Sequence, residues 1–167
     1  IETANDQTLQ LINRGHDFQC SRHAVELTAE RGITVGGHII IGLPGETAEE
    51  SIAQAHVMSS LPLDILKIHQ MQIIKGTRLA AMYAEKPFHL YTPDEYTETI
   101  ISYLEHLRPD IAVERFASQS PKDLLIAPQW GLKNYELTNL VVNKMKREGR
   151  YQGSLSTESN LSIAIPG

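Results

Sequence analysis

The chain has 167 residues, which is enough for one domain of ordinary size and too few for two comfortable ones. Its 15 Lys and Arg against 20 Asp and Glu give a net charge of −5, which argues against a surface built throughout to grip nucleic acid. The single cysteine, Cys20, excludes an internal disulfide framework and a multi-cysteine metal site made by this chain alone. With no apolar run near the roughly 18 residues of a membrane span and no secretion signal, we predict a soluble cytoplasmic protein.

The first quarter of the chain predicts two helices and one strand. The capping residue Asn5 indicates the start of a helix that ends by Gly15. A second helix is expected over about 17–31, with Cys20 inside it as a small packing residue. The segment 33–41 is β-branched and continuously apolar near its end, so we expect a strand that is covered on both faces.

Helices and strands continue to alternate along the rest of the chain. In order, we predict a helix after the capping box Thr47-x-x-Glu50, a strand at 65–69, a short helix from Thr77 to Glu85, a helix from Thr92 to Arg108, a strand at 111–116, an ordered loop at 117–133 and a helix at 135–148. This order predicts parallel βαβ units with right-handed crossovers. Three strands are few, and the start at Ile1 rather than at methionine leads us to expect a barrel or half barrel without its first part.

Ligands of parallel α/β folds bind at the carboxyl ends of the strands, where this sequence places Glu2, the segment 38–46 and the segment 69–77. The turn Gly-Leu-Pro-Gly allows close backbone approach, and the helix after it points its positive end nearby. Each signal also has a simpler interpretation. The glycines are needed to reverse a strand into a helix, and a lone strand histidine such as His38 is more often a hydrogen-bonded core residue.

Four motifs in order are more specific than any one of them. They are Ile-Glu-Thr-Ala-Asn-Asp at 1–6, Leu-Ile-Asn-Arg-Gly-His at 11–16, Ile-Gly-Leu-Pro-Gly-Glu-Thr at 41–47 and Lys-Gly-Thr at 75–77. Together they resemble the second half of a radical S-adenosylmethionine (SAM) enzyme, in the branch of the oxygen-independent coproporphyrinogen oxidases. The run Pro-Lys-Asp-Leu-Leu-Ile-Ala-Pro-Gln-Trp at 121–130 is similar to the C-terminal signature of the bacterial family called YhcC-like.

The resemblance implies a fold and a domain division. The chain would be the C-terminal portion of an α/β (βα)6 half barrel with parallel strands, followed by a helical extension. Residues 1–116 would form the partial half barrel, from the end of its fourth strand through its sixth strand and the following helix and strand. Residues 117–151 would form a C-terminal loop and helix cap, and 152–167 a mobile tail.

The resemblance also implies six residues that hold SAM. Glu2 matches the polar residue that contacts the ribose or amino acid part, and Arg14 matches an arginine that approaches the carboxylate. His38 stands where oxidase relatives carry an aspartate for the ribose hydroxyls. Gly42 would let the adenine lie against its strand, while Gln70 and Gln72 would offer backbone groups to the adenine edge.

The superfamily cleaves SAM reductively with a [4Fe–4S] cluster that is held by three cysteines. Since Cys20 is the only cysteine, we expect the cluster ligands to lie upstream and this chain to hold no metal by itself. The full-length protein would then generate a 5′-deoxyadenosyl radical, and this portion would supply part of the SAM pocket and the substrate-facing strand ends. The sequence names neither the catalytic residues nor the substrate.

Besides a domain of a tRNA-interacting modification enzyme, two other classes of function stay open at this point. One is a non-catalytic nucleotide- or phosphate-binding module that uses the turn 42–45. The other is a metal-dependent hydrolase that uses His38 and His69, which is weak because no carboxylates accompany them on the strand ends.

The expected partners are the N-terminal half of the same protein and a small-molecule or RNA substrate, with no membrane. The segment 133–150 carries five cations against two acids and is either a landing patch for tRNA or a solvated helix face. We expect Trp130 to anchor the loop before it. The strand 33–41 would keep one open edge, so the isolated chain is expected to associate with itself.

Overall fold

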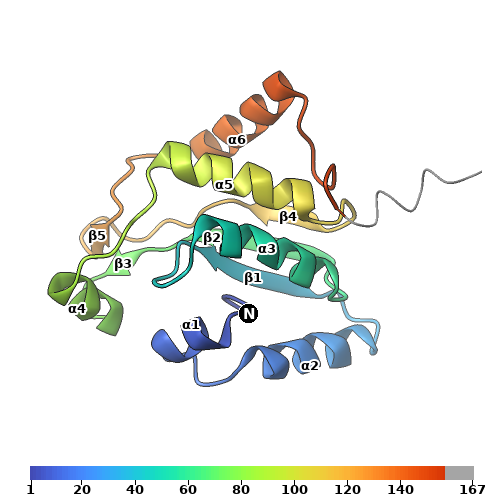
Figure 1. Ribbon diagram of the computed structural model, residues 1–167, viewed down its shortest axis with the longest axis horizontal. Coiled ribbons are helices and arrows are strands. Elements are labelled where there is room, and N and C mark those ends of the chain that lie inside the picture. The colour runs from blue at the N-terminus through green and yellow to red at the C-terminus, as the bar shows by residue number, and fades with distance from the viewer. Residues whose placement is uncertain (157–167) are drawn as a thin grey trace, which may run out of the picture.

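The centre of the molecule is a parallel sheet of three strands (Figure 1). The computed structural model describes residues 1–156, and the sheet order is β1 (Gly36–Ile41), β2 (Ile65–Gln70), β4 (Ala112–Arg115). Both pairings are parallel, with Gly36 opposite Ile65 and a bulge between β2 and β4 near Lys67. The predicted parallel α/β class is therefore confirmed.

Every predicted helix is present, within about four residues of its expected bounds. The helices are α1 (Asp6–Leu11), α2 (Phe18–Ala29), α3 (Ala48–Ser59), α4 (Arg78–Glu85), α5 (Pro93–His106) and α6 (Asn134–Glu148). The predicted capping box at Thr47 forms, and Thr92 makes a second one, because each threonine accepts a backbone N–H from a glutamate three residues later. None of the helices within residues 1–156 is long and apolar enough to cross a membrane.

One face of the sheet carries the main apolar core. Helices α3 and α5 lie side by side across this face, as Figure 1 shows. Their buried side chains include Met58 on α3 and Tyr96 and Ile100 on α5, which pack against Leu66 and Ile68 of the central strand. Right-handed connections place consecutive helices on the same side of a parallel sheet, which explains why this face is fully covered.

The opposite face, which we call the open face, carries His38, Lys67, His69 and Arg115. Along β1, exposed or half-buried residues on this face alternate with buried residues on the core face. The expectation that the strand at 33–41 is covered on both faces is therefore wrong. Val35, Ile39 and Ile41 enter the main core, whereas Ile40 is only partly buried and Ile33 is 56% exposed before the strand begins.

Two further expectations differ from the structure. Cys20 does not pack in the core: it lies on α2 but is exposed, because Ser21 and Val25 turn toward the protein instead. The predicted loop 117–133 contains a strand, β5 (Leu125–Ala127), which pairs antiparallel with β3 (Ile73–Ile74). This small second sheet places the loop beside the carboxyl end of β2.

The C-terminal segment is packed as far as the structure describes it. The amide of Gln152 donates to the carbonyl oxygens of Arg108 and Ile111, and the N–H of Leu155 donates to the carbonyl of Glu105. The packed part of the chain thus extends past the predicted boundary at residue 151. The rest of the predicted tail, 157–167, lies outside the described residues.

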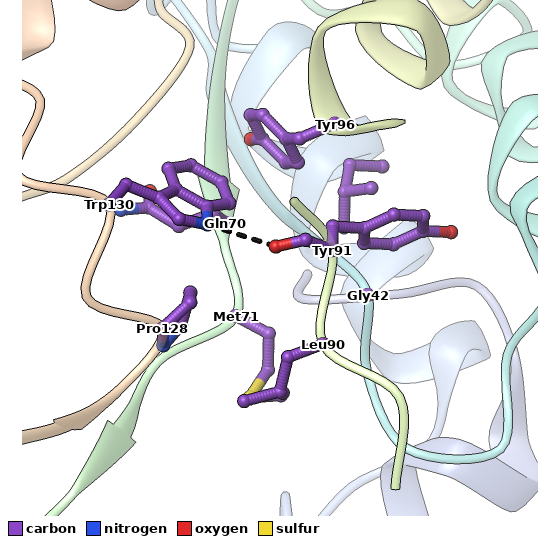
Figure 2. A pocket seen from close by; sticks show the side chains of 9 residues that line it. Gly42, Gln70, Met71, Leu90, Tyr91, Tyr96, Pro128 and Trp130 are labelled. Carbon is purple, nitrogen blue, oxygen red and sulfur yellow. Dashed lines mark hydrogen bonds between the residues drawn. The ribbon is translucent and has the colours of Figure 1, made fainter. Parts of the chain in front are cut away.

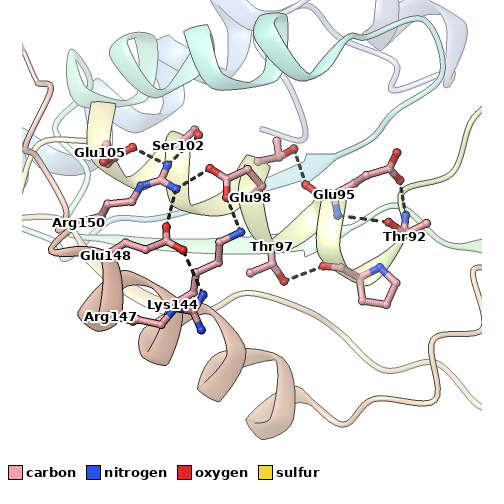
Figure 3. A network of polar contacts seen from close by, with 12 residues as sticks. Thr92, Glu95, Thr97, Glu98, Ser102, Glu105, Lys144, Arg147, Glu148 and Arg150 are labelled. Carbon is pink, nitrogen blue, oxygen red and sulfur yellow. Dashed lines mark hydrogen bonds and ion pairs between the residues drawn. The ribbon is translucent and has the colours of Figure 1, made fainter.

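Helix α6 is fastened to α5 by a network of charged groups (Figure 3). The guanidinium of Arg150 donates to Glu105 at 2.8 Å and also reaches Glu98 and Ser102 on α5. Lys144 lies 2.6 Å from Glu98, and its hydrogen bond is the main reason that the pKa of Glu98 is lowered. The Glu105 side chain is only 13% exposed, and Arg150 is the charged donor that pairs with its carboxylate.

We expect Arg150→Ala to lower the free energy of unfolding by about 1.5–3 kcal/mol, because it leaves a half-buried carboxylate without its charged donor. Arg147→Ala is the matched control. Its side chain is 71% exposed and pairs only with the neighbouring Glu148, so the expected change is about 0.5 kcal/mol or less. Urea denaturation measures both, and equal losses in the two variants would contradict the assigned role of the network.

Candidate functional site

Glu2 lies beside the first strand in an unusual backbone conformation. Its φ is +74°, in the left-handed region that residues with a side chain rarely adopt. Its N–H donates to the carbonyl of His38, and its carbonyl accepts from the N–H of Ile40, which makes a parallel bridge at the edge of β1. Such conformations persist where the surrounding structure holds them, often at functional sites.

The neighbouring Thr3 explains how this conformation is held. Thr3 is fully buried, and its hydroxyl donates to the carboxylate of Glu46 at 2.6 Å. The side-chain oxygen of Gln54 on α3 accepts the N–H of Ala4, and its amide donates to Glu46. The first residues of the chain are therefore tied to the turn after β1 and to α3.

Arg14 approaches Glu2, and the resemblance implies that both contact SAM. The Nε of Arg14 lies 3.6 Å from a carboxylate oxygen of Glu2, and both side chains are about one-third exposed. This Nε is buried and has no hydrogen-bond partner among residues 1–156. The pair presents a positive and a negative group side by side at the edge of the sheet.

The open face brings four basic side chains together from three strands. Lys67 lies opposite both His38 and Arg115 in the strand register, and it pairs with Glu114 at 3.0 Å. The rings of His38 and His69 are 5.3 Å apart between centroids. Within the described residues, the buried Nε2 of His69 and the buried Nε of Arg115 have no hydrogen-bond partner. This face is suited to a ligand that offers acceptors or negative charge.

Both histidines of the open face are held toward the neutral form. Desolvation is the main reason that the pKa of His38 and the pKa of His69 are lowered. The positive charges of Lys67 and Arg115 act in the same direction, and the carboxylate of Glu2 opposes them. Neutral imidazoles can donate or accept a hydrogen bond, so they remain available to a polar ligand near pH 7.

Gly42 makes room for an aromatic side chain. Its φ is +88°, and a Cβ at this position would stand 2.8 Å from the ring of Tyr91. Figure 2 shows Tyr91 against Gly42, with Trp130 donating its indole N–H to the carbonyl of Tyr91 at 2.9 Å. The Trp130 ring also lies 5.1 Å from that of Tyr96, so the prediction that it anchors the loop is confirmed. A role of Gly42 toward adenine stays a prediction.

Gln70 and Gln72 fasten the following loop to the end of β2. The amide of Gln70 donates to the carbonyl of Ser118 and accepts its N–H, both at 2.9 Å. Gln72 accepts the hydroxyl of Ser120 at 2.6 Å. The side chains of both glutamines are therefore structural, and only their backbone groups remain for the adenine contact that the resemblance implies.

The basic segment 133–150 is largely neutralised. Three of its five cations, Lys144, Arg147 and Arg150, form ion pairs with acidic residues of α5 and α6. This arrangement agrees better with a helix packed through its charges than with a landing patch for nucleic acid.

The structure brings the predicted Glu2, Arg14 and His38 to one side of the sheet, while Gly42 and the glutamines stand at its carboxyl end. Sequence reasoning missed Thr3, Lys67 and Arg115. The alternation of Lys67 and His69 in a strand could have indicated a polar face for the last two. Within residues 1–156, no three His, Cys, Asp or Glu side chains gather as metal ligands.

Comparison with known proteins assigns the chain to a family. The family model described as Radical_SAM C-terminal domain matches residues 63–147, about half of the chain. The protein MJ0486 of Methanocaldococcus jannaschii is 32% identical over 155 residues, covering 92% of this chain and 48% of that protein. The protein YhcC of Escherichia coli K12 is 32% identical over 130 residues, covering 78% of this chain and 42% of that protein. The chain thus spans about half the length of these relatives.

More distant relatives extend the comparison. The tRNA uridine(34) acetyltransferase of Methanocaldococcus infernus is 26% identical over 153 residues, covering 89% of this chain and 28% of that protein. The solved structure of Methanocaldococcus infernus Elp3 with an N-terminal deletion superposes with a TM-score of 0.79, at 23% identity, over 90% of this chain and 35% of that one. This last likeness concerns the fold.

We expect the imidazoles of His38 and His69 to titrate below the ordinary histidine pKa of 6.5 in an NMR titration. Arg115→Gln should raise the pKa of His69, because a nearby positive charge is removed. Titration of both at or above the ordinary value would contradict the arrangement of the open face.

The same lowered pKa values fix the sign of a stability effect. The unfolded chain takes up these protons more readily than the folded one, so stability is complete above about pH 6.5 and falls as the pH falls below it. His69→Gln should reduce this loss, as measured by urea denaturation at about pH 7 and pH 5.

Proposed function

The chain belongs to the radical SAM C-terminal domain family, and we propose that it supplies part of the SAM pocket of a longer radical SAM enzyme. The observation that carries this proposal is the pairing of Glu2 with Arg14 at the edge of the sheet. The strained backbone of Glu2 is anchored through Thr3, so the carboxylate is positioned before any ligand arrives.

The residues present suit the two ends of SAM. The guanidinium of Arg14 would bind the carboxylate, because its buried Nε has an unused donor and a planar cation suits a planar anion. The carboxylate of Glu2 would accept hydrogen bonds from the ribose hydroxyls or the amino group. His38 would act as a neutral hydrogen-bonding group where relatives carry an aspartate. Gly42 and the backbone at Gln70 and Gln72 would contact the adenine.

Bound SAM, reduced by a [4Fe–4S] cluster, supplies the radical that abstracts hydrogen in this superfamily. We place the cluster ligands outside this chain, whose one cysteine is the exposed Cys20 on α2. The open face would then line the interior of the half barrel and turn Lys67, His69 and Arg115 toward the substrate side. A cytoplasmic location stays a prediction.

A second candidate is that the longer enzyme modifies tRNA. The similarity to a tRNA uridine(34) acetyltransferase supports this candidate. The neutralised charges of α6 do not favour docking on that helix, so contact with RNA would fall on another surface.

We expect Arg14→Ala in the full-length enzyme to weaken SAM binding by about 1.5–3 kcal/mol, the range for a hydrogen bond to a charged group. Arg22→Ala is the matched control, because Arg22 lies on α2 and stacks over Phe18 instead of facing Glu2. Calorimetric titration with SAM gives both affinities. An unchanged affinity for SAM in Arg14→Ala would contradict the proposed contact and would mean that Arg14 is a solvated surface residue.

The outer edge of β1 is available for pairing with another strand. Glu2 forms an isolated bridge at Ile39, through hydrogen bonds to His38 and Ile40, and no strand pairs with this edge of β1 within residues 1–156. We propose that the N-terminal half of the enzyme pairs with this edge.

The isolated chain is accordingly expected to associate with itself through the same edge. Light scattering over a range of concentrations measures this, and hydrogen exchange locates it. A monomer whose amides along Gly36–Ile41 are protected on both edges would contradict the proposal.

A further inference from the structure

A cavity of about 660 Å3 opens beside the carboxyl end of β2, between this strand and the loop 117–133. Its volume lies within the range of small-molecule sites. The loop is rigidly placed around it, because Gln70 and Gln72 hold Ser118 and Ser120 on one side. On the other side the indole of Trp130 is fixed to the backbone of Tyr91.

The charged side chains of the cavity are of one sign. Lys122 and Lys133 line it, and no carboxylate of residues 1–156 does. Neither ammonium group forms an ion pair with any residue of 1–156, although Lys133 stands 5.8 Å above the ring of Tyr135. Helix α6 starts directly after Lys133, so its positive end adds to the potential, partly offset by the Glu136 carboxylate that accepts the Lys133 N–H. The cavity therefore favours an anion.

The rest of the lining is apolar or neutral. Leu125, Pro128, Leu132 and the Trp130 ring form an apolar wall, and the serines and glutamines supply neutral polar groups. A ligand that suits both parts has a flat ring with a negatively charged group attached. SAM itself suits the cavity poorly, since its sulfonium would face two unpaired lysines.

We propose that this cavity binds a nucleoside phosphate, with Lys122 and Lys133 facing the phosphate and the apolar wall facing the base. The cavity adjoins the SAM pocket of the proposed function at Gln70 and Gln72, which line the cavity and whose backbone groups are assigned to the adenine. Its occupant and its two lysines are distinct from that pocket, so the proposal does not depend on SAM binding. The same chemistry occurs in a free nucleotide and in one unit of a single-stranded RNA, and the experiment distinguishes these two sources.

Trp130 is the only tryptophan of the chain and lines the cavity, so its fluorescence reports on ligand entry. The probes are uridine 5′-monophosphate, uridine and a short oligouridylate, because an adenine would also enter a SAM pocket. Equilibrium dialysis with labelled probes measures the same affinities without relying on the fluorophore. We expect saturable binding of a phosphate-bearing probe, weakening with salt, and much weaker binding of uridine.

The test variant is Lys122→Ala with Lys133→Ala, which should raise the Kd of the phosphate-bearing probe about tenfold or more. Its control is Lys86→Ala with Lys146→Ala, which removes the same charge from two exposed lysines outside the cavity and should leave the Kd unchanged. Binding of the monophosphate supports a free nucleotide, and binding of the oligouridylate alone supports an RNA unit.

Three results would overturn the proposal. They are the absence of saturable binding by both phosphate probes, equal affinity for uridine and its monophosphate, and equal Kd values in the test and control variants. Competition between SAM and the monophosphate would also overturn it, because the two would then share one pocket. If Arg14→Ala loses SAM binding and retains monophosphate binding, the cavity binds its ligand independently of the SAM pocket.

Discussion

The packing of α3 and α5 on one face of the parallel sheet is the contact on which the other features depend. It buries Met58, Tyr96 and Ile100 against the central strand and fixes the register of β1 and β2. Because right-handed connections put both helices on the same side, the opposite face keeps its polar side chains. His38, Lys67, His69 and Arg115 lie on the open face because the helices bury only the other face of the sheet.

Local signals predicted the helices well, whereas contacts between distant segments could not be predicted. Thr47 and Thr92 indicate where their helices begin, because a capping box involves only residues that are close in sequence. The antiparallel pairing of β3 with β5 joins short segments far apart in sequence, neither long enough to show a period. Cys20 was misplaced because its residue type favours burial, while the direction of α2 decides its exposure.

The candidate site shows the same division. Glu2 and Arg14 could be identified because a family motif carries them, and the structure brings them within 3.6 Å. Lys67 and Arg115 stand in no motif, and they meet only because β2 and β4 are neighbours in the sheet. Family membership follows from the match over 63–147, but the chemistry of the open face depends on side chains that only the fold assembles.

The hydrogen bond from Trp130 to the Tyr91 carbonyl links two regions that are far apart in sequence. Tyr91 fills the space at Gly42, at the start of the turn after β1, while Trp130 lines the cavity of the loop 117–133. A ligand that shifted Trp130 on entering the cavity would therefore act on Tyr91, whose ring packs against Gly42. By thermodynamic linkage, the free energy of such coupling is reciprocal, so an occupant of the turn would change the affinity of the cavity by the same factor.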